Sequence, residues 1–206
     1  INGLEWIRLH YAHPAHLHRN MIKKFGELNK LVPYIDMPVQ HGSSKILKSM
    51  RRGLGPDGIR QRISDLRKVH PNIALRTSII VGFPGESEED FQLLYDFIEE
   101  IEFDRLGVFT YSEEEGTYGA TLEDDISMKL KTERMDAIML LQQDINLDKN
   151  KFRVGKIEKV LIDMHGEDGV SIGRSYRDAP EVDNYITINE KLPVGEFIDL
   201  KITKAF

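Results

Sequence analysis

The chain has 206 residues and a formal net charge of −6, enough for one large domain or for a medium and a small one. The negative charge argues against a general polyanion-binding protein, which would need a basic face. With no cysteine, this chain itself forms no disulfide, thiolate zinc site or thiolate-bound iron–sulfur cluster. Its longest apolar run, residues 78–83, falls far short of the roughly 18 residues that cross a membrane.

These observations predict a cytoplasmic protein with no membrane partner. No signal-peptide pattern is present, because Ile1 follows no initiator Met and no basic segment. We therefore expect the sequence to have been cut from a longer chain.

Strands and helices alternate in the first part of the chain. Alternating side chains predict strands, and apolar stripes at helical spacing predict helices. In chain order we expect a strand at Leu4–Ala12, a helix at Ala15–Leu31, a strand at Tyr34–Val39, a short helix capped by Ser43 or Ser44 and ended by Gly53, and a helix capped by Asp57.

The third strand lies within Ile73–Phe83, and its nearly continuous apolar run predicts burial on both faces, as in a parallel sheet. Ser87 and Asp90 resemble a capping box at the start of the next helix, with Asp in place of the usual Glu or Gln. A fourth strand follows at Arg105–Ser112. Such alternation indicates parallel strands joined by right-handed crossovers. Four strands are too few to close a barrel, so we expect part of a larger β/α barrel.

The pattern changes after the fourth strand. A polar stretch at Glu113–Asp125 leaves the sheet, and a long helix is predicted at Thr132–Lys151. Short segments of period two then follow near 157–164, 170–177, 184–188 and 196–203. They predict a small antiparallel β-barrel. The predicted fold class is therefore α/β, with a partial barrel at 1–151 and a small β-barrel at 152–206.

The turn Gly82–Gly85 stands at the carboxyl end of the third strand, where a parallel barrel binds its ligands. The glycines would let a flat ligand approach the backbone, and amides before the Ser87 helix would face an anionic group. The alternative is a tight strand-to-helix turn with no ligand. The turn lacks the Lys-Ser/Thr ending of a phosphate loop.

Several polar side chains have two possible roles. Arg76 lies mid-strand among apolar residues, so it faces either a structural carboxylate, with Asp36 a possible partner, or an anionic ligand. Gln40, His41 and Ser43 either bind a polar ligand or face solvent. His13 and His16 are a weak metal candidate. The basic helix with Lys45, Lys48, Arg51 and Arg52 is either a solvated face or a phosphate contact.

The predicted C-terminal domain is acidic. Residues 152–206 hold eight Lys and Arg against ten Asp and Glu, a net charge of −2. Sequence-independent RNA binding favours the opposite sign, so the domain favours a protein or basic-peptide partner, although Arg174 and Arg177 can contact phosphates locally.

With these residues in view, the chain resembles the radical S-adenosylmethionine (SAM) methylthiotransferases along essentially its whole length. The stretches WIRLHY, PYIDMPVQHGSSKILKSMRRG, LRTSIIVGFPGESEEDF and DRLGVFTYSEEEGT are similar, in order, to the third to sixth strand regions of that family's barrel. The C-terminal part resembles its TRAM domain, a five-stranded barrel similar to an OB-fold. The stretches YIDMPVQH and GRSYRDAPEVD resemble the branch that modifies protein 12 of the small ribosomal subunit.

The resemblance implies an enzyme that uses SAM and two [4Fe-4S] clusters to methylthiolate the β-carbon of an aspartate in that basic ribosomal protein. The implied metal ligands and catalytic residues lie outside this chain. Strand-end positions imply cofactor contacts at Gln40, His41, Arg76, Val81, Gly82, Phe109 and Tyr111. The implied substrate-docking residues are Arg174, Arg177, Asp178, Glu181 and Asp183.

The chain departs from the family where the clusters would be bound. It lacks the cluster cysteines, the first two barrel strands and the N-terminal domain, so we expect it to be inactive alone. Two alternatives remain open. One is the transfer-RNA methylthiotransferase branch, with RNA as partner; the other is a cysteine-free binding or scaffold protein.

Overall fold

A computed structural model describes residues 2–206 and divides them into two compact units that meet between Ile145 and Asn146. The division lies inside helix α5 (Met128–Lys151), a few residues before the predicted boundary at 151 and 152. The two units are described separately below. No helix of residues 2–206 is both long and apolar enough to cross a membrane.

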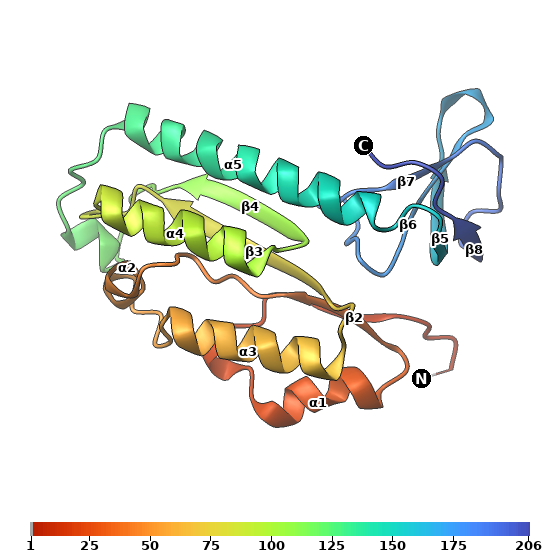
Figure 1. The fold of residues 1–206 in the computed structure, drawn as a ribbon, viewed down its shortest axis with the longest axis horizontal. Helices are drawn as coiled ribbons and strands as arrows, with labels where there is room; N and C mark the ends of the chain where they lie inside the picture. The colour runs from red at the N-terminus through yellow and green to blue at the C-terminus, as the bar shows by residue number, and fades with distance from the viewer. Residues whose placement is uncertain (1) are drawn as a thin grey trace. The chain divides into compact units, whose positions relative to one another are not determined.

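The first unit is built on a four-stranded parallel sheet in the order β1-β2-β3-β4, as the alternating pattern predicts (Figure 1). Its strands are β1 (Ile7–Leu9), β2 (Leu31–Asp36), β3 (Ala74–Val81) and β4 (Arg105–Thr110). Its helices are α1 (Arg19–Glu27), α2 (Ser44–Ser49), α3 (Pro56–Val69), α4 (Glu88–Ile101) and most of α5, with 3-10 turns η1 (Pro14–His16) and η2 (Gly119–Thr121).

Helix starts follow local chemistry, with two corrections to the predicted bounds. Helix α3 is capped by Gly55 rather than by Asp57, because Pro56 occupies the first helical position, where its missing N–H costs no hydrogen bond. The single helix predicted at Ala15–Leu31 is broken into η1 and α1, because Leu17 leaves the helical conformation. Ser43 caps α2, and Ser87 with Asp90 forms the predicted capping box of α4.

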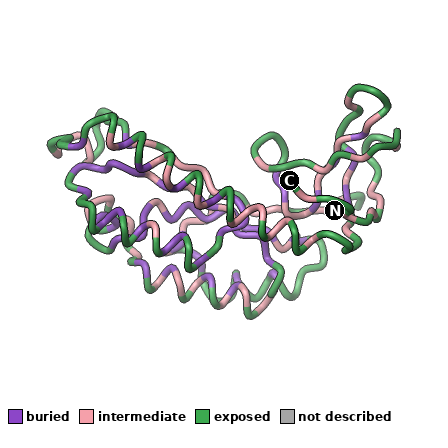
Figure 2. The backbone as a smooth tube through the Cα atoms, turned by 45° about the horizontal axis from the view of Figure 1, so that its top comes forward, coloured by how far each residue is buried: buried purple, intermediate pink, exposed green. Residues whose placement is uncertain are grey.

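Strand β3 is buried on one face only, so the prediction of burial on both faces is wrong. Leu75, Ile79 and Val81 belong to the apolar core beneath the helices, whereas Arg76, Ser78 and Ile80 are half-buried (Figure 2). The second face looks into the interior of the incomplete barrel, where the described strands provide no further cover. Ligand-facing positions of β3 are therefore the alternate ones.

The second unit, Asn146–Phe206, holds a four-stranded antiparallel sheet in the order β7-β6-β5-β8. Its strands are β5 (Ile157–His165), β6 (Ser171–Arg174), β7 (Ile186–Ile188) and β8 (Phe197–Lys201), with a 3-10 turn η3 (Glu167–Gly169) between β5 and β6. The four segments lie where the period of two predicts strands. The pairing is an open sheet edged by β7 and β8 within residues 146–206.

Candidate functional site

An open pocket of about 670 Å³ lies at the carboxyl ends of the parallel strands in the first unit. Each strand or the loop that follows it contributes to the pocket, because carboxyl ends of parallel strands meet at one edge of the sheet. Its walls come from the exits of β1 and β2, the second half of β3, the end of β4, the end of α2 and the loop at 114–119. Three predicted cofactor contacts, Gln40, Phe109 and Tyr111, line this pocket.

The pleat of β3 decides which strand residues reach the pocket. Ile80 pairs with Phe109 across the sheet, and both line the pocket, with Phe109 57% exposed. Val81, predicted as a cofactor contact, is fully buried in the core on the opposite face. Ser78 and Ile80 were missed, and the alternation of β3 was the signal that would have found them.

Tyr111 lines the pocket with a largely buried side chain. Its ring packs edge-on against Phe83 at 5.1 Å, and its hydroxyl is buried without a hydrogen-bond partner among residues 2–206. Burial and the nearby carboxylates of Glu113 and Asp124 raise the pKa of Tyr111 above its ordinary value. The hydroxyl therefore stays protonated, and it is enclosed by protein next to Gly119 rather than open to the pocket.

Strained backbone gathers around the same pocket. Tyr11, Gln40 and Arg51 line it, and each has a positive φ, of 59°, 74° and 54° respectively. Such values are uncommon outside glycine and often mark binding sites. The backbone of Gln40 also pairs with β3, donating to Ser78 O and accepting from Ile80 N, which fixes its position at the pocket wall.

Arg51 and Arg52 form a cationic rim at the end of α2. The Arg51 guanidinium stacks over the ring of Tyr118 at 4.0 Å, and Arg52 Nη2 donates to Pro38 O at 2.9 Å. Burial lowers the pKa of Arg52 from its ordinary value, yet the group stays charged at neutral pH. The second half of the basic helix thus borders the pocket rather than an open solvated face.

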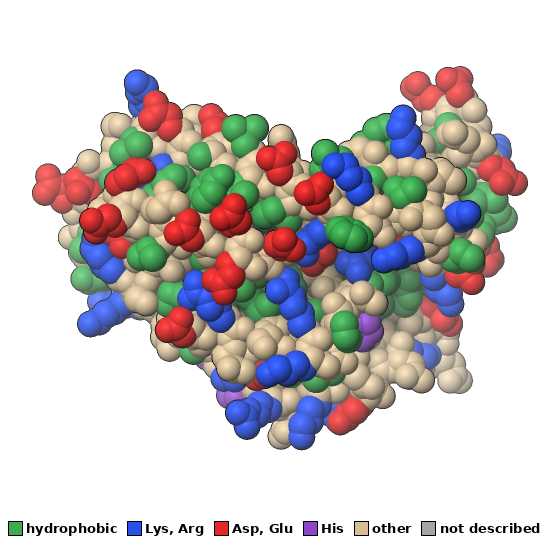
Figure 3. All heavy atoms as spheres, viewed as in Figure 1, with side chains coloured by type: hydrophobic (Ala, Val, Ile, Leu, Met, Phe, Trp, Pro, Cys, Tyr) green, Lys and Arg blue, Asp and Glu red, His purple; other side chains and the backbone are tan. Residues whose placement is uncertain are grey.

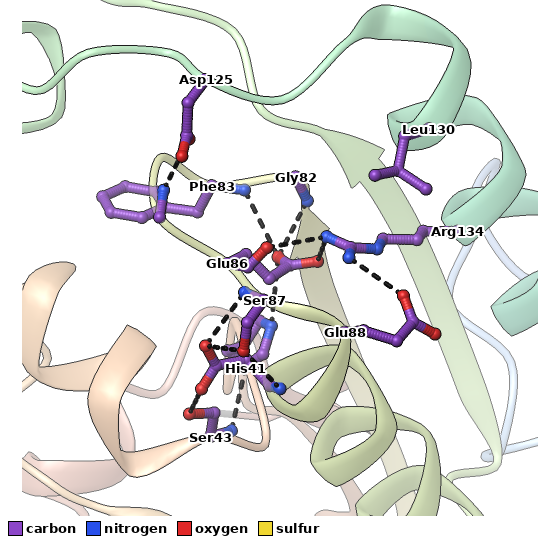
Figure 4. Close-up of polar contacts among 12 residues, drawn as sticks. His41, Ser43, Gly82, Phe83, Glu86, Ser87, Glu88, Asp125, Leu130 and Arg134 are labelled. Carbon is purple, nitrogen blue, oxygen red and sulfur yellow. Dashed lines mark hydrogen bonds and ion pairs between the residues drawn. The ribbon is translucent and has the colours of Figure 1, made fainter.

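The Gly82 turn binds an anion, and that anion is the protein's own carboxylate. Glu86 Oε2 accepts hydrogen bonds from the backbone N–H groups of Gly82 at 2.8 Å and Phe83 at 3.3 Å (Figure 4). Gly82 has a φ of 72°, and a Cβ there would lie 2.3 Å from Lys131 Cγ, so glycine is required on two counts. Gly85 N donates to Asp125 instead of to a ligand.

Glu86 joins two buried partners from distant elements. His41 Nδ1 accepts from Ser43 N at 2.9 Å, which leaves the ring proton on Nε2, 3.3 Å from Glu86 Oε2. Arg134 of α5 donates to Glu86 Oε1 at 2.8 Å, and both side chains are almost wholly buried. His41, predicted as a cofactor contact, therefore has both ring nitrogens engaged by the protein.

Asp90 ties the starts of two helices together. Its carboxylate accepts from the hydroxyls of Ser43 at 2.7 Å and Ser87 at 2.8 Å, and from Lys45 Nζ at 2.7 Å. Burial raises the pKa of Asp90, but the hydrogen bonds from Lys45, Ser43 and Ser87 outweigh it and hold that pKa well below the ordinary value. Asp90 thereby fixes the start of α2 against the start of α4.

Arg76 has the structural carboxylate that the sequence suggested. Its Nη1 donates to Asp36 Oδ1 at 3.1 Å on the interior face of the sheet. Neither residue lines the pocket at the strand ends. Arg76 and Asp36 thus fill the interior below the site.

Comparisons with known proteins agree with this geometry. The sequence profile of the radical SAM superfamily matches residues 2–98, and that of the TRAM domain matches residues 154–206. The chain is 47% identical over 205 residues to the ribosomal protein uS12 methylthiotransferase RimO of Acetivibrio thermocellus, covering 98% of this chain and 45% of that protein. It is 48% identical over 208 residues to RimO of Clostridium kluyveri, covering 100% of this chain and 46% of that protein.

The chain holds a radical SAM domain and a TRAM domain, and it is similar over nearly its whole length to uS12 methylthiotransferases. It spans about half the length of the curated relatives that it matches. Among solved structures it is similar to coproporphyrinogen III oxidase (HemN) from Escherichia coli, a radical SAM enzyme. That similarity has a TM-score of 0.58 and 16% identity, covering 68% of this chain and 32% of that one, and it concerns the fold alone.

The family's two cofactors fit this chain differently. The pocket is compatible with SAM, because it combines apolar walls at Ile80 and Phe109 with the polar side chain of Gln40. An iron–sulfur cluster has no ligands here, because the chain has no cysteine and residues 2–206 contain no group of three or more metal-ligating side chains.

His13, predicted as a weak metal candidate, caps η1 through its Nδ1, which accepts a hydrogen bond from Ala15 N. Burial and the neighbouring Arg52 and His16 lower the His13 pKa.

The predicted docking residues of the TRAM unit divide into buried and exposed ones. Asp178 is buried and accepts from Ser175 Oγ at 2.8 Å, and Asp183 Oδ2 accepts from Ala179 N at 2.8 Å, so both hold the loop in shape. Arg174 pairs with Asp163 at 3.4 Å. Glu181 is exposed, with a φ of 67°, and Arg177 is half-exposed. Of the predicted docking residues, Glu181 is the exposed one.

Proposed function

We propose that this chain is the barrel wall and TRAM domain of an enzyme that methylthiolates the β-carbon of an aspartate in ribosomal protein uS12. The observation that supports it most is the pocket at the strand ends, in a chain 42–48% identical to uS12 methylthiotransferases over nearly its whole length. Its proposed substrate is a ribosomal protein, so the enzyme would act in the cytoplasm.

SAM would supply a 5′-deoxyadenosyl radical once it is cleaved at a cluster bound elsewhere in the full enzyme. In this chain Ile80 and Phe109 would hold the flat adenosine, with Gln40 hydrogen-bonding its polar edge and Tyr111 lining the site. Gly82, with its fixed backbone, would close the wall. Val81, His41 and Arg76 would support these residues from behind without touching SAM.

The second cofactor set, two [4Fe-4S] clusters, would be held entirely by parts of the enzyme that this chain lacks. With no cysteine of its own, the chain should be inactive alone. We derive no step at the clusters from its residues. The role of these residues is to position SAM and exclude water around it.

The TRAM unit would dock the basic substrate protein. Its net charge of −2, from eight basic and ten acidic residues at 152–206, suits such a partner. Glu181 would offer an exposed carboxylate at the tip of the 175–183 loop, whose shape depends on Asp178 and Asp183.

A hybrid enzyme tests this proposal. The matching part of the Acetivibrio thermocellus relative is replaced by this chain, and the purified, cluster-loaded hybrid is given SAM and uS12. Mass spectrometry should find a methylthio group on one aspartate of uS12, and the unaltered relative is the positive control. A cluster-loaded hybrid that cleaves SAM but modifies only transfer RNA, or neither substrate, contradicts the proposal.

A further inference from the structure

The chain's charge is divided unequally along its length. Residues 1–72 hold 13 Lys and Arg against 5 Asp and Glu, a net charge of +8. Residues 73–206 hold 15 Lys and Arg against 29 Asp and Glu, a net charge of −14. The total net charge of −6 therefore does not reveal that the first part of the chain is strongly basic.

The fold collects this basic part on one side of the first unit. Helices α1 and α3 pack against each other, and Gly26 of α1 lies against Val69 of α3. Together the two helices carry seven Lys and Arg against three Asp and Glu, whereas α4 carries six acidic residues and no basic one. In Figure 3 Lys and Arg gather over α1 and α3, at the bottom of the view, and Asp and Glu over α4 and α5.

Most cations around α1 form no ion pair with any of residues 2–206. Arg19, Lys23 and Lys30 are exposed and form no ion pair with any residue of the described range. Lys24 alone is paired, with Glu27 at 2.5 Å. An unpaired, exposed set of like charges repels itself, so an anionic partner gains more there than at a balanced surface.

We propose that the face formed by α1, Lys30 and α3 binds the phosphate backbone of RNA. Arg19 and Lys23 stand one helical turn apart, about 6 Å along the axis, which suits a regularly repeating anion. Exposed Asn20 and Asn29 flank the cations and can hydrogen-bond phosphate or sugar oxygens. These groups contact the phosphates and sugars of RNA rather than its bases, so the binding is sequence-independent and sensitive to salt.

This inference does not depend on the proposed enzymatic function. It assigns RNA binding to the face formed by α1, Lys30 and α3, whereas the proposed function assigns substrate docking to the acidic TRAM unit. The two proposals can therefore fail separately, because RNA binding is measured with this chain alone, without SAM or clusters.

The test uses a fluorescein-labelled 20-base-pair RNA duplex and three forms of the 206-residue chain. The first is the unaltered chain, and the second carries Arg19→Glu, Lys23→Glu and Lys30→Glu. The third is a matched control with the same charge change on exposed TRAM lysines, Lys156→Glu, Lys191→Glu and Lys204→Glu. Fluorescence anisotropy is recorded from 50 to 200 mM salt, and polyglutamate is offered as a competitor.

The unaltered chain should bind the duplex with an affinity that falls steeply with salt. The α1 variant should bind at least tenfold more weakly at 50 mM salt, with a log–log salt slope shallower by about 2 to 3, since each lost phosphate contact removes roughly 0.7 to 0.9. The TRAM control should lose much less. The proposal is wrong if the unaltered chain does not bind RNA, if the control loses as much, or if polyglutamate binds as tightly as RNA.

Discussion

Two regions at the end of β3 lie a few residues apart and differ in whether their buried polar atoms have hydrogen-bond partners within the protein. Around Glu86, each carboxylate oxygen has a partner within the protein, and the side chain is fully buried. In the adjacent pocket, the Tyr111 hydroxyl is buried without a partner among residues 2–206, and three lining residues hold strained backbone conformations. The first region has its polar atoms paired within the protein, whereas the second keeps a buried donor unsatisfied and borders an open pocket.

The comparison shows how the amides of a strand-end turn are used by the protein's own carboxylate next to an open pocket. The amides of the Gly82 turn are directed to Glu86, which in turn holds His41 and Arg134. These contacts join the exits of β2 and β3 to α5. The pocket walls are therefore held by a rigid polar cluster behind them, which is the arrangement that precise ligand placement needs.

Glu86→Gln should produce the largest effect. It removes the charge opposite Arg134 in a site that excludes water, and breaking a buried pair costs about 3 to 5 kcal/mol of unfolding free energy. Urea unfolding followed by Trp6, the one tryptophan of the chain, reports on the first unit. Glu88→Gln is the control, because Glu88 also pairs with Arg134 but is 77% exposed. Equal losses of unfolding free energy in the two variants would mean that the burial of Glu86 does not strengthen its pairing with Arg134.

Gly82→Ala should cost about 2 to 3 kcal/mol. Its Cβ would meet Lys131, which is 3% exposed and held by Asp124 at 2.5 Å, so the side chain has little room to move. Gly85 has a similar φ of 78°, but open space surrounds the position where a Cβ would be added. Gly85→Ala should therefore cost only about 1 kcal/mol of unfolding free energy, from backbone strain. The same unfolding measurement separates the two, and a Gly82 variant no worse than the Gly85 variant contradicts the close-packing argument.

Asp90→Asn should cost about 2 kcal/mol at pH 7, because Asp90 accepts from two helix caps and a lysine. The pKa of Asp90 is lowered in the folded state, so its contribution is present above the unfolded pKa of about 4 and is lost as pH falls through the folded value. The parent chain should thus lose its advantage over the variant as pH drops below about 4. The control Glu89→Gln, at an exposed position in the same helical turn, should cost less than about 0.5 kcal/mol at pH 7.

Phe109→Ala should affect stability least, by less than about 1 kcal/mol, because its ring is 57% exposed. In the hybrid enzyme it should nevertheless raise the KM for SAM about tenfold, since the ring forms an apolar wall of the pocket. Leu93→Ala, exposed on α4, is the control and should leave KM unchanged. A Phe109 variant with normal KM would place SAM elsewhere.

Local patterns predicted much of the architecture. The alternation of strands and helices, the capping box at Ser87 and Asp90, and the change to period two after α5 follow from short-range physics, and the structure confirms them. The capping of α3 was misplaced because Pro56 and Asp57 are adjacent and both favour helix starts. Strand-end position also predicted Gln40, Phe109 and Tyr111 at the pocket, but it did not distinguish them from Val81 on the other face.

The sequence by itself determined the class of fold, the parallel order of the barrel strands and the place of the ligand side, because periodicity and chain order dictate them. Only the tertiary structure decided what the Gly82 turn holds. Its partner Glu86 lies four residues away, but the side chains that keep Glu86 buried come from His41 and Arg134, 45 and 48 residues distant in the chain. Burial and long-range pairing of charges have no local signature, so the fold alone assigns the turn to its own carboxylate and leaves the neighbouring pocket open.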